Sequence, residues 1–201
     1  RKYQFEPPRR GRVGLKCSYY GQPDRSRNEI YYGQPRQGTK DFHAYATACI
    51  ISHGHRYTVA LAWVRRHETM VAVLGRLLAT IRAIGLKIRH VLLDRAFFNV
   101  AVVEFLKQNK LSFLMPVVMR GRKPKKGRAA TGLRWIHKQS AGWYSHTMKN
   151  RGQQTTVNVC VGYRQHRNRK DGKRVSQKLL FAAWGIFLFV GAHLAALDRK
   201  S

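Results

Sequence analysis

The sequence predicts an α/β protein in which strands and helices alternate, followed by a strand-rich part that carries much of the positive charge. Within residues 42–119, β-rich apolar runs are interrupted by two stretches with the spacing of amphipathic helices. Within residues 120–178, seventeen bases stand against one acid, Asp171, and β-like runs lie between basic loops. We therefore expect a core of strands and helices with a cationic, β-rich insertion.

The N-terminal segment, residues 1–41, is expected to contribute a first core strand at 12–20. The same segment contains the pentapeptide Tyr-Tyr-Gly-Gln-Pro twice, at 19–23 and at 31–35. Each copy is interpreted as an aromatic pair that leads into a turn containing glycine.

Residues 42–52 and 56–64 are two β-rich runs, separated by His53-Gly54-His55. The glycine suits a hairpin turn, so the two strands should pair antiparallel. Two histidines without a third ligand are interpreted as polar turn residues rather than as a metal site.

The first helix is predicted over 70–84, where large apolar residues recur at helical spacing. Glu68 and Thr69 are expected in its first turn, and Gly85 stands just past its end. A short apolar run at 88–93 then has the length of a buried strand.

Asp94 directly follows that strand. Asn99 is a good N-cap for a second helix over 100–109, and the apolar run at 111–119 predicts a further strand.

The expected insertion opens with a loop, 120–128, that is too charged and too rich in glycine and proline to pack. Three β-like runs follow, at 143–148, 155–163 and 178–184. Residues 149–152 suit a hairpin turn, and a second basic loop is expected at 164–174.

The C-terminal segment, residues 179–201, contains nineteen residues without formal charge, 179–197. This length also suits a membrane span of roughly 20 residues. The hydrophobicity of this run is lowered by Gly185, Gly191 and His193. The preferred interpretation is therefore a buried strand followed by the start of a core helix, and a membrane is an unfavoured partner.

The balance of charge points to nucleic acid as partner. The chain has 201 residues with 39 Lys and Arg against 9 Asp and Glu, for a formal net charge of +30. Such a surface attracts phosphate. Three widely spaced cysteines favour neither a zinc ribbon nor a disulfide framework, and they indicate a reducing, cytoplasmic environment. Because the chain begins with Arg1, we expect it to be a piece of a longer protein.

Nine basic residues are predicted to contact phosphates because they cluster in the two loops of the insertion. They are Arg120, Arg122, Lys123, Lys125, Lys126, Arg128, Arg167, Arg169 and Lys170. The aromatics that follow the first loop, Trp135, Trp143 and Tyr144, could stack on unpaired bases. For the tryptophans, burial in the core of the insertion is the preferred interpretation.

Asp94 is the acid whose position best suits catalysis, because carboxylates at strand ends are where α/β sheets bind ligands and metal ions. The alternative is a salt bridge to Arg95 or a cap for the following turn.

The run from Gly38 to Gly121 strongly resembles the catalytic core of DDE transposases of the insertion-sequence-four group. LLDRAFF at 92–98 looks like the strand that carries the second metal-binding aspartate of that family, and FHAYAT at 42–47 resembles its second strand. The resemblance implies a ribonuclease-H-like fold, with a mixed sheet flanked by helices. It also implies three carboxylates that hold two Mg²⁺ or Mn²⁺ ions for cleavage and strand transfer of double-stranded DNA at transposon ends.

Carried over residue by residue, the resemblance assigns only Asp94, as catalytic residue and metal ligand. The position of the first aspartate falls near Val13, where no acid stands, and Asp24 or Asp41 could replace it. The third acid, a glutamate on a helix well beyond Gly185, has no match. The remaining later acids are Glu104, Asp171 and Asp198.

The sequence thus predicts a truncated or degenerate transposase that binds DNA. A homo-oligomer of this chain is a possible partner. By itself it should have little or no cleavage activity, because one acid cannot hold two metal ions. The alternative is a non-catalytic DNA-binding regulator derived from a transposase.

Overall fold

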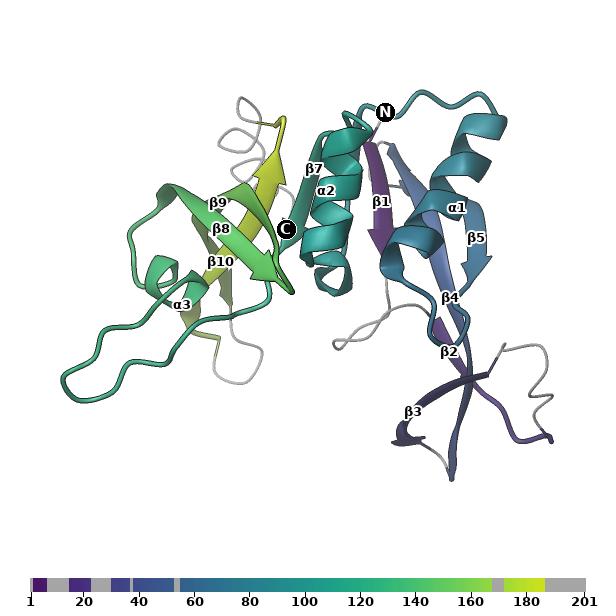
Figure 1. Cartoon of the computed structure of the whole chain (residues 1–201), viewed down its shortest axis with the longest axis horizontal. Coiled ribbons are helices and arrows are strands. Elements are labelled where there is room, and N and C mark those ends of the chain that lie inside the picture. The colour runs from purple at the N-terminus through teal and green to yellow at the C-terminus, as the bar shows by residue number, and fades with distance from the viewer. Residues whose placement is uncertain are drawn as a thin grey trace. The chain divides into compact units, whose positions relative to one another are not determined.

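The computed structural model describes residues 2–6, 15–22, 30–36, 38–52, 55–167 and 172–186. The chain divides into two compact units, Arg1–Phe97 and Phe98–Ser201, and each is described by itself. The units are mixed α/β and rich in strands (Figure 1).

The first unit is a mixed sheet organised around one long strand, β4. Its strands are β1 (Lys2–Glu6), β2 (Leu15–Ser18), β3 (Ile30–Arg36), β4 (Thr39–Ser52), β5 (His55–Trp63) and β6 (His90–Leu92). Strands β1, β2, β3 and β5 all pair antiparallel with β4, and β1 also pairs with β6 in parallel. The predicted antiparallel pairing of 42–52 with 56–64 is confirmed, whereas turn residues 53 and 54 lie outside the described residues.

Two strands of this unit were not expected from the sequence. β1 pairs with both β4 and β6, and β3 contains the whole of the second Tyr-Tyr-Gly-Gln-Pro copy, which was wrongly expected to turn. The first copy does form a turn, in which the Tyr19 hydroxyl donates to the Gln22 carbonyl at 3.0 Å. The two copies differ because the second continues along β4, with an irregular register between Tyr32 and Arg36.

Helix α1 (Met70–Ala83) covers one face of this sheet. Thr69 is its N-cap and accepts a hydrogen bond from the Ala72 N–H at 3.2 Å. Glu68 precedes the helix rather than lying in its first turn. Gly85 follows the helix with a φ of 75°, a left-handed conformation that favours glycine. The buried side of α1 packs on β4 and β5 through Val73, Leu74, Leu77, Leu78 and Ile81.

The second unit contains two helices and an antiparallel sheet. Its elements are α2 (Val100–Gln108), β7 (Phe113–Pro116), α3 (Leu133–Ile136), β8 (Gly142–Asn150), β9 (Gln153–Arg167) and β10 (Arg174–Trp184). The strands follow the order β7, β10, β9, β8. The predicted N-cap of α2 is confirmed, because the Asn99 side chain accepts from the Val102 N–H at 2.9 Å.

Of the second basic loop, predicted at 164–174, the described residues 164–167 and 174 belong to strands. Residues 164–167 of β9 pair with 174–177 of β10, and residues 168–171 lie outside the described residues. The prediction was wrong because backbone pairing between two strands does not require apolar side chains at their exposed end.

The apolar run at the C-terminus begins as strand. Leu179 to Trp184 belong to β10, and Ala182 and Ala183 are buried. No helix in the described part of the chain is both long enough and apolar enough to span a membrane. Residues 187–201 lie outside the described residues.

Candidate nucleic-acid interface and the Asp94 site

The first basic loop forms a hairpin-like projection, here called the cationic finger, residues 120–131. It leaves the sheet after β7 and returns to α3 (Figure 1). Near its tip, Lys125 and Arg128 exchange two backbone hydrogen bonds, of 3.1 and 2.9 Å. The finger is therefore an ordered hairpin, although the sequence predicted only an unpacked loop.

Hydrogen bonds close the base of the finger. The Thr131 hydroxyl accepts from the Arg122 N–H at 2.9 Å, and the Arg134 Nε–H donates to the Gly121 carbonyl at 3.0 Å. Gly121 has a φ of +110°, and a Cβ there would lie 2.0 Å from the Thr131 carbonyl oxygen. Glycine is required at this position because any side chain would push the two arms of the finger apart.

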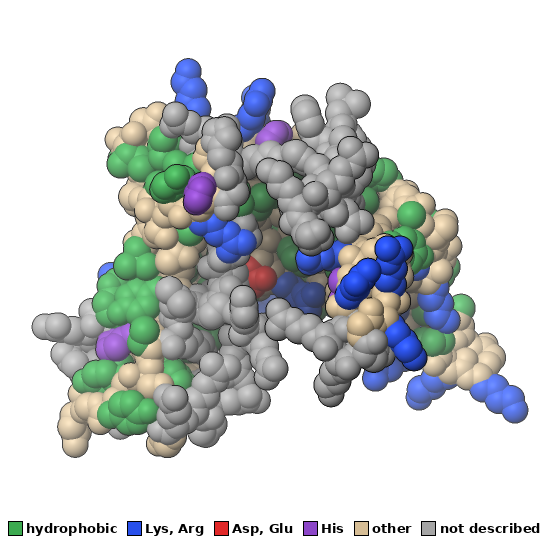
Figure 2. Space-filling model, turned by 180° about the vertical axis from the view of Figure 1, so that it is seen from behind, with side chains coloured by type: hydrophobic (Ala, Val, Ile, Leu, Met, Phe, Trp, Pro, Cys, Tyr) green, Lys and Arg blue, Asp and Glu red, His purple; other side chains and the backbone are tan. Residues whose placement is uncertain are grey.

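The finger brings together six of the nine predicted phosphate-binding residues. These six are exposed, and residues 120–131 contain no acid. Arg167 lies elsewhere, exposed at the end of β9 opposite Arg174. Arg169 and Lys170 lie outside the described residues. On the face seen in Figure 2, Lys and Arg side chains clearly outnumber Asp and Glu. Exposed cations without nearby acids give a strong local attraction for phosphate.

The β8–β9 turn adds two exposed cations that the sequence analysis did not single out, Lys149 and Arg151. The turn was predicted correctly, and its two central residues, Arg151 and Gly152, have φ angles of 45° and 82°. Positive φ at both positions is typical of a type I′ turn, where Asn and Gly are preferred. The signal available in the sequence was the presence of two bases, at 149 and 151, in the predicted turn.

The tryptophans of the insertion do not lie in its core, so that interpretation was wrong. Trp135 and Trp143 are 47% and 38% exposed. Smaller apolar residues fill the core instead, including Val157, Val159, Val161, Leu180 and Ala182. The Trp135 ring meets Tyr144 edge-on, with centroids 6.4 Å apart. Aromatic surface is therefore available near the finger.

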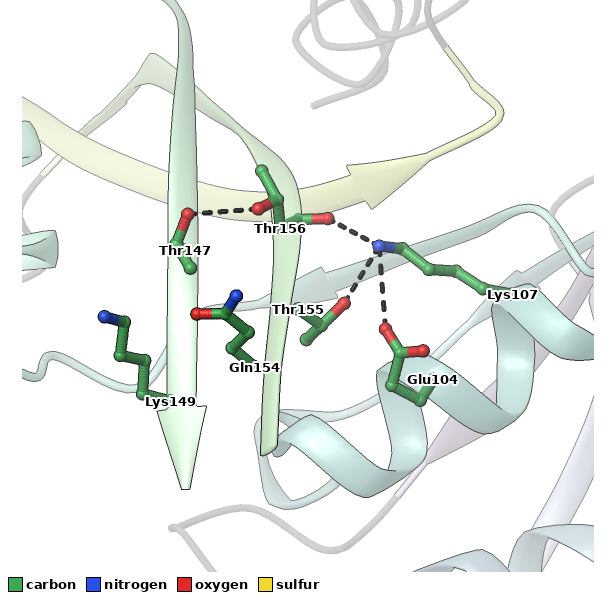
Figure 3. A pocket seen from close by; sticks show the side chains of 7 residues that line it. All are labelled: Glu104, Lys107, Thr147, Lys149, Gln154, Thr155 and Thr156. Carbon is green, nitrogen blue, oxygen red and sulfur yellow. Dashed lines mark hydrogen bonds and ion pairs between the residues drawn. The ribbon is translucent and has the colours of Figure 1, made fainter. Parts of the chain in front are cut away.

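A polar cavity of about 630 Å³ lies between α2 and the β8–β9 hairpin (Figure 3). Lys107 on α2 donates from Nζ to the Thr155 hydroxyl at 2.9 Å and to the Thr156 carbonyl at 2.7 Å. Its third polar neighbour is the Glu104 carboxylate, at 3.8 Å. Because the ammonium group already donates two hydrogen bonds and lies beside a carboxylate, Lys107 fastens α2 to β9 rather than offering a free charge to a ligand.

Asp94 follows β6 and is half-buried. Its backbone carbonyl accepts from the Phe97 N–H at 3.0 Å, which closes the 3₁₀ turn Arg95–Phe97. Its carboxylate forms no ion pair with Arg95 and no hydrogen bond to any other described residue. The carboxylate therefore serves neither of the structural roles considered from the sequence.

The backbone brings one other acidic residue to the level of Asp94. Gln4 of β1 pairs with Leu92 of β6, and Glu6 and Asp94 each stand two residues further along. Asp41 is far from this level, because Glu6 pairs with Thr47. Six residues of strand separate Asp41 from Thr47, a span of roughly 20 Å.

The described residues do not fit a site for two metal ions. No group of three His, Cys, Asp or Glu side chains in the described ranges is arranged to hold a metal ion. Val13, Asp24, Asp171 and Asp198 lie outside those ranges, so the predictions that involve them remain predictions. Two closely spaced dications need several carboxylates to offset their repulsion.

Comparison with known proteins identifies the family. A family model described as the transposase DDE domain matches residues 21–179, a range that contains both Asp94 and the cationic finger. No curated protein gives a significant match. Members of this family act on DNA in transposition and generally use divalent metal ions. Since the matched range covers most of the sequence, the chain belongs to the transposase DDE domain family.

Proposed function

We propose that this chain is a DNA-binding transposase of the insertion-sequence-four group, with a ribonuclease-H-like core, that does not cleave DNA by itself. The topology of the first unit supports the core. The β4–β5 hairpin, β1 antiparallel to it and β6 parallel to β1 form a mixed sheet with α1 on one face. The cationic finger supports DNA binding. The target is double-stranded DNA at transposon ends.

The observation that carries DNA binding is the finger itself, with six exposed cations on a hairpin closed by hydrogen bonds. A triple variant, K123Q/K125Q/K126Q, removes three of these cations without touching Gly121, Thr131 or Arg134. Affinity for duplex element-end DNA is measured by fluorescence anisotropy as a function of salt. The plot of log K against log salt should lose roughly 0.9 of slope for each phosphate contact removed.

A matched triple variant, K40Q/R89Q/K110Q, removes the same charge at exposed positions outside the finger. It should change the slope much less. If the two triple variants lower affinity and slope equally, the finger is not the interface and the proposal is wrong.

The absence of independent cleavage has its own test. Purified chain is incubated with element-end DNA and Mg²⁺ or Mn²⁺, and nicked products are measured. We expect none, because Asp94 has no complete set of acids in the described residues. Nicking that is lost in Asp94→Ala would overturn this part of the proposal. Loss in Glu6→Gln as well would identify Glu6 as its companion.

The isolation of Asp94 favours a second candidate function, a regulator that occupies transposon ends without cutting them. It predicts a footprint on element ends that Asp94→Asn leaves unchanged. Equal protection of unrelated DNA would contradict it.

A further inference from the structure

One face of the sheet of the first unit is covered by α1, and the opposite face is exposed along β5, although Ile30 and Cys49 on that face are buried. The covered face includes Ala44, Ala46 and Ala62, which are buried. Strand alternation places Leu61 and Trp63 of β5 on the opposite face, where they are 58% and 39% exposed. Large apolar side chains on an open sheet face indicate a binding surface.

The repeated pentapeptide supplies aromatic rings from both sides of β4. Tyr19, from the first copy, meets His43 edge-on with centroids 4.9 Å apart, and His43 meets Trp63 at 5.1 Å. Trp63 also contacts Tyr45, at 4.4 Å. Tyr32, from the second copy, is the β3 residue opposite Asp41 and is 36% exposed. We call these five residues, Tyr19, Tyr32, His43, Tyr45 and Trp63, the aromatic face.

The charge beside the aromatic face is positive. Arg66 lies over the Tyr32 ring, with its guanidinium carbon 4.5 Å from the centroid, and Arg65 next to it is also exposed. Two acids lie nearby: Glu68 is paired with Arg76 at 2.7 Å, and the single charge of Asp41, opposite Tyr32, leaves Arg65 and Arg66 in excess. Arg76 also donates to the Trp63 carbonyl, which fixes the end of β5. A partner that suits this surface is therefore both flat and anionic.

We propose that the aromatic face binds single-stranded DNA, with unpaired bases stacked on Trp63 and Tyr32 and phosphates held by Arg65 and Arg66. Every base has a π-face, and each base stacked on an aromatic side chain contributes about 1–3 kcal/mol. Bases in a duplex already stack on one another, so this surface distinguishes single strands from duplexes. The inference does not rest on the proposed function, because the finger lies in the other unit.

The test uses the full chain with oligothymidylate and, separately, with duplex DNA. Binding of the single strand should quench tryptophan fluorescence, and Trp63→Phe should remove much of that quenching. Tyr32→Ala should weaken oligothymidylate binding by about tenfold, the equivalent of 1.4 kcal/mol. Duplex affinity should stay unchanged in both variants. The triple variant K123Q/K125Q/K126Q should instead lose duplex affinity and keep its affinity for oligothymidylate.

The matched control is Tyr57→Ala. Tyr57 is 55% exposed on β5 and pairs with Ile50, which alternation places on the face that carries α1. It should bind oligothymidylate as the unaltered chain does. Thermal melting is used to check that Tyr32→Ala and Trp63→Phe are folded. If Tyr32→Ala does not fold, Trp63→Phe still tests the proposal, because it keeps an aromatic ring.

Two results would overturn the inference. One is single-strand binding that both Tyr32→Ala and Trp63→Phe leave unchanged. The other is self-association that Tyr32→Ala abolishes in sedimentation, because the face would then be an interface between two copies of the chain.

Discussion

Gly121 fixes the base of the cationic finger through its backbone conformation. Replacing it with alanine should destabilise the chain by about 1–3 kcal/mol, since its φ of +110° suits glycine and the new Cβ would overlap the Thr131 carbonyl. DNA affinity should fall with it. Gly127→Ala is the control, because Gly127 has a φ of +74° but no atom within 4 Å of the added Cβ. Equal losses of unfolding free energy in urea would show that steric overlap at Gly121 is unimportant.

His146 on β8 should make the stability of the fold depend on pH. Burial lowers the pKa of its imidazole below the usual 6.5, because the charged form loses hydration. In acid, the unfolded chain therefore takes up this proton before the folded chain does. The contribution of His146 to stability is present above pH 6.5 and is lost as pH falls through the lower folded pKa. His146→Gln should flatten the decline of unfolding free energy between neutral and mildly acidic pH, and an unchanged decline would contradict this role.

The sequence predicted the roles of single residues well where these roles depend on neighbours a few positions away. Asn99 was placed at a helix start because its side chain can accept from the N–H three residues on, and it does. Thr69 was expected in the first turn of α1 and is its N-cap in the same way. The exposure of Trp135 and Trp143 could not be predicted from neighbouring residues in the sequence. It depends on which strands pack together, and valines from β9 fill the space expected for the rings.

Lys107 joins α2 to the strand that leads away from the β8–β9 turn. Lys107→Met should lower the unfolding free energy by about 1–3 kcal/mol, because it removes two hydrogen bonds from a charged donor and leaves the buried Thr155 hydroxyl without its partner. Lys149→Met is the control in the same cavity (Figure 3). As an exposed side chain it should change stability by no more than about 0.5 kcal/mol. A denaturant titration in which both variants behave alike would mean that Lys107 is not a tether.

Among the elements, α1, α2 and the β4–β5 pair followed from periodicity over short windows. β1 and β3 did not, since their identity as strands comes from pairing with β4, and β1 also needs β6, far along the sequence. The strand structure at the basic end of β9 and β10 was not predicted for the same reason, because it depends on the pairing of these two strands.

For the molecule as a whole, a net charge of +30 implies strong self-repulsion in the folded state. Added NaCl should therefore raise the melting temperature by several degrees, with most of the effect by about 0.1 M, where the Debye length falls to about 10 Å. Calorimetry at increasing salt checks this. A melting temperature that is flat or falls over that range would mean that the cations are spaced too widely to repel. The finger could be located from the sequence because its bases are neighbours along the chain. A set of metal-binding acids could not, because such acids come from distant segments that only the fold brings together.

The parallel pairing of β1 with β6 has a consequence for how the first unit assembles. Lys2 pairs with His90, so this seam of the sheet joins residues almost a full unit apart in the sequence. Such distant pairing slows folding, because a long loop must close before the seam forms. The β4–β5 hairpin and α1 can form early, while the seam that sets Glu6 level with Asp94 arrives last. The expected result is a slow final phase in the folding of the first unit.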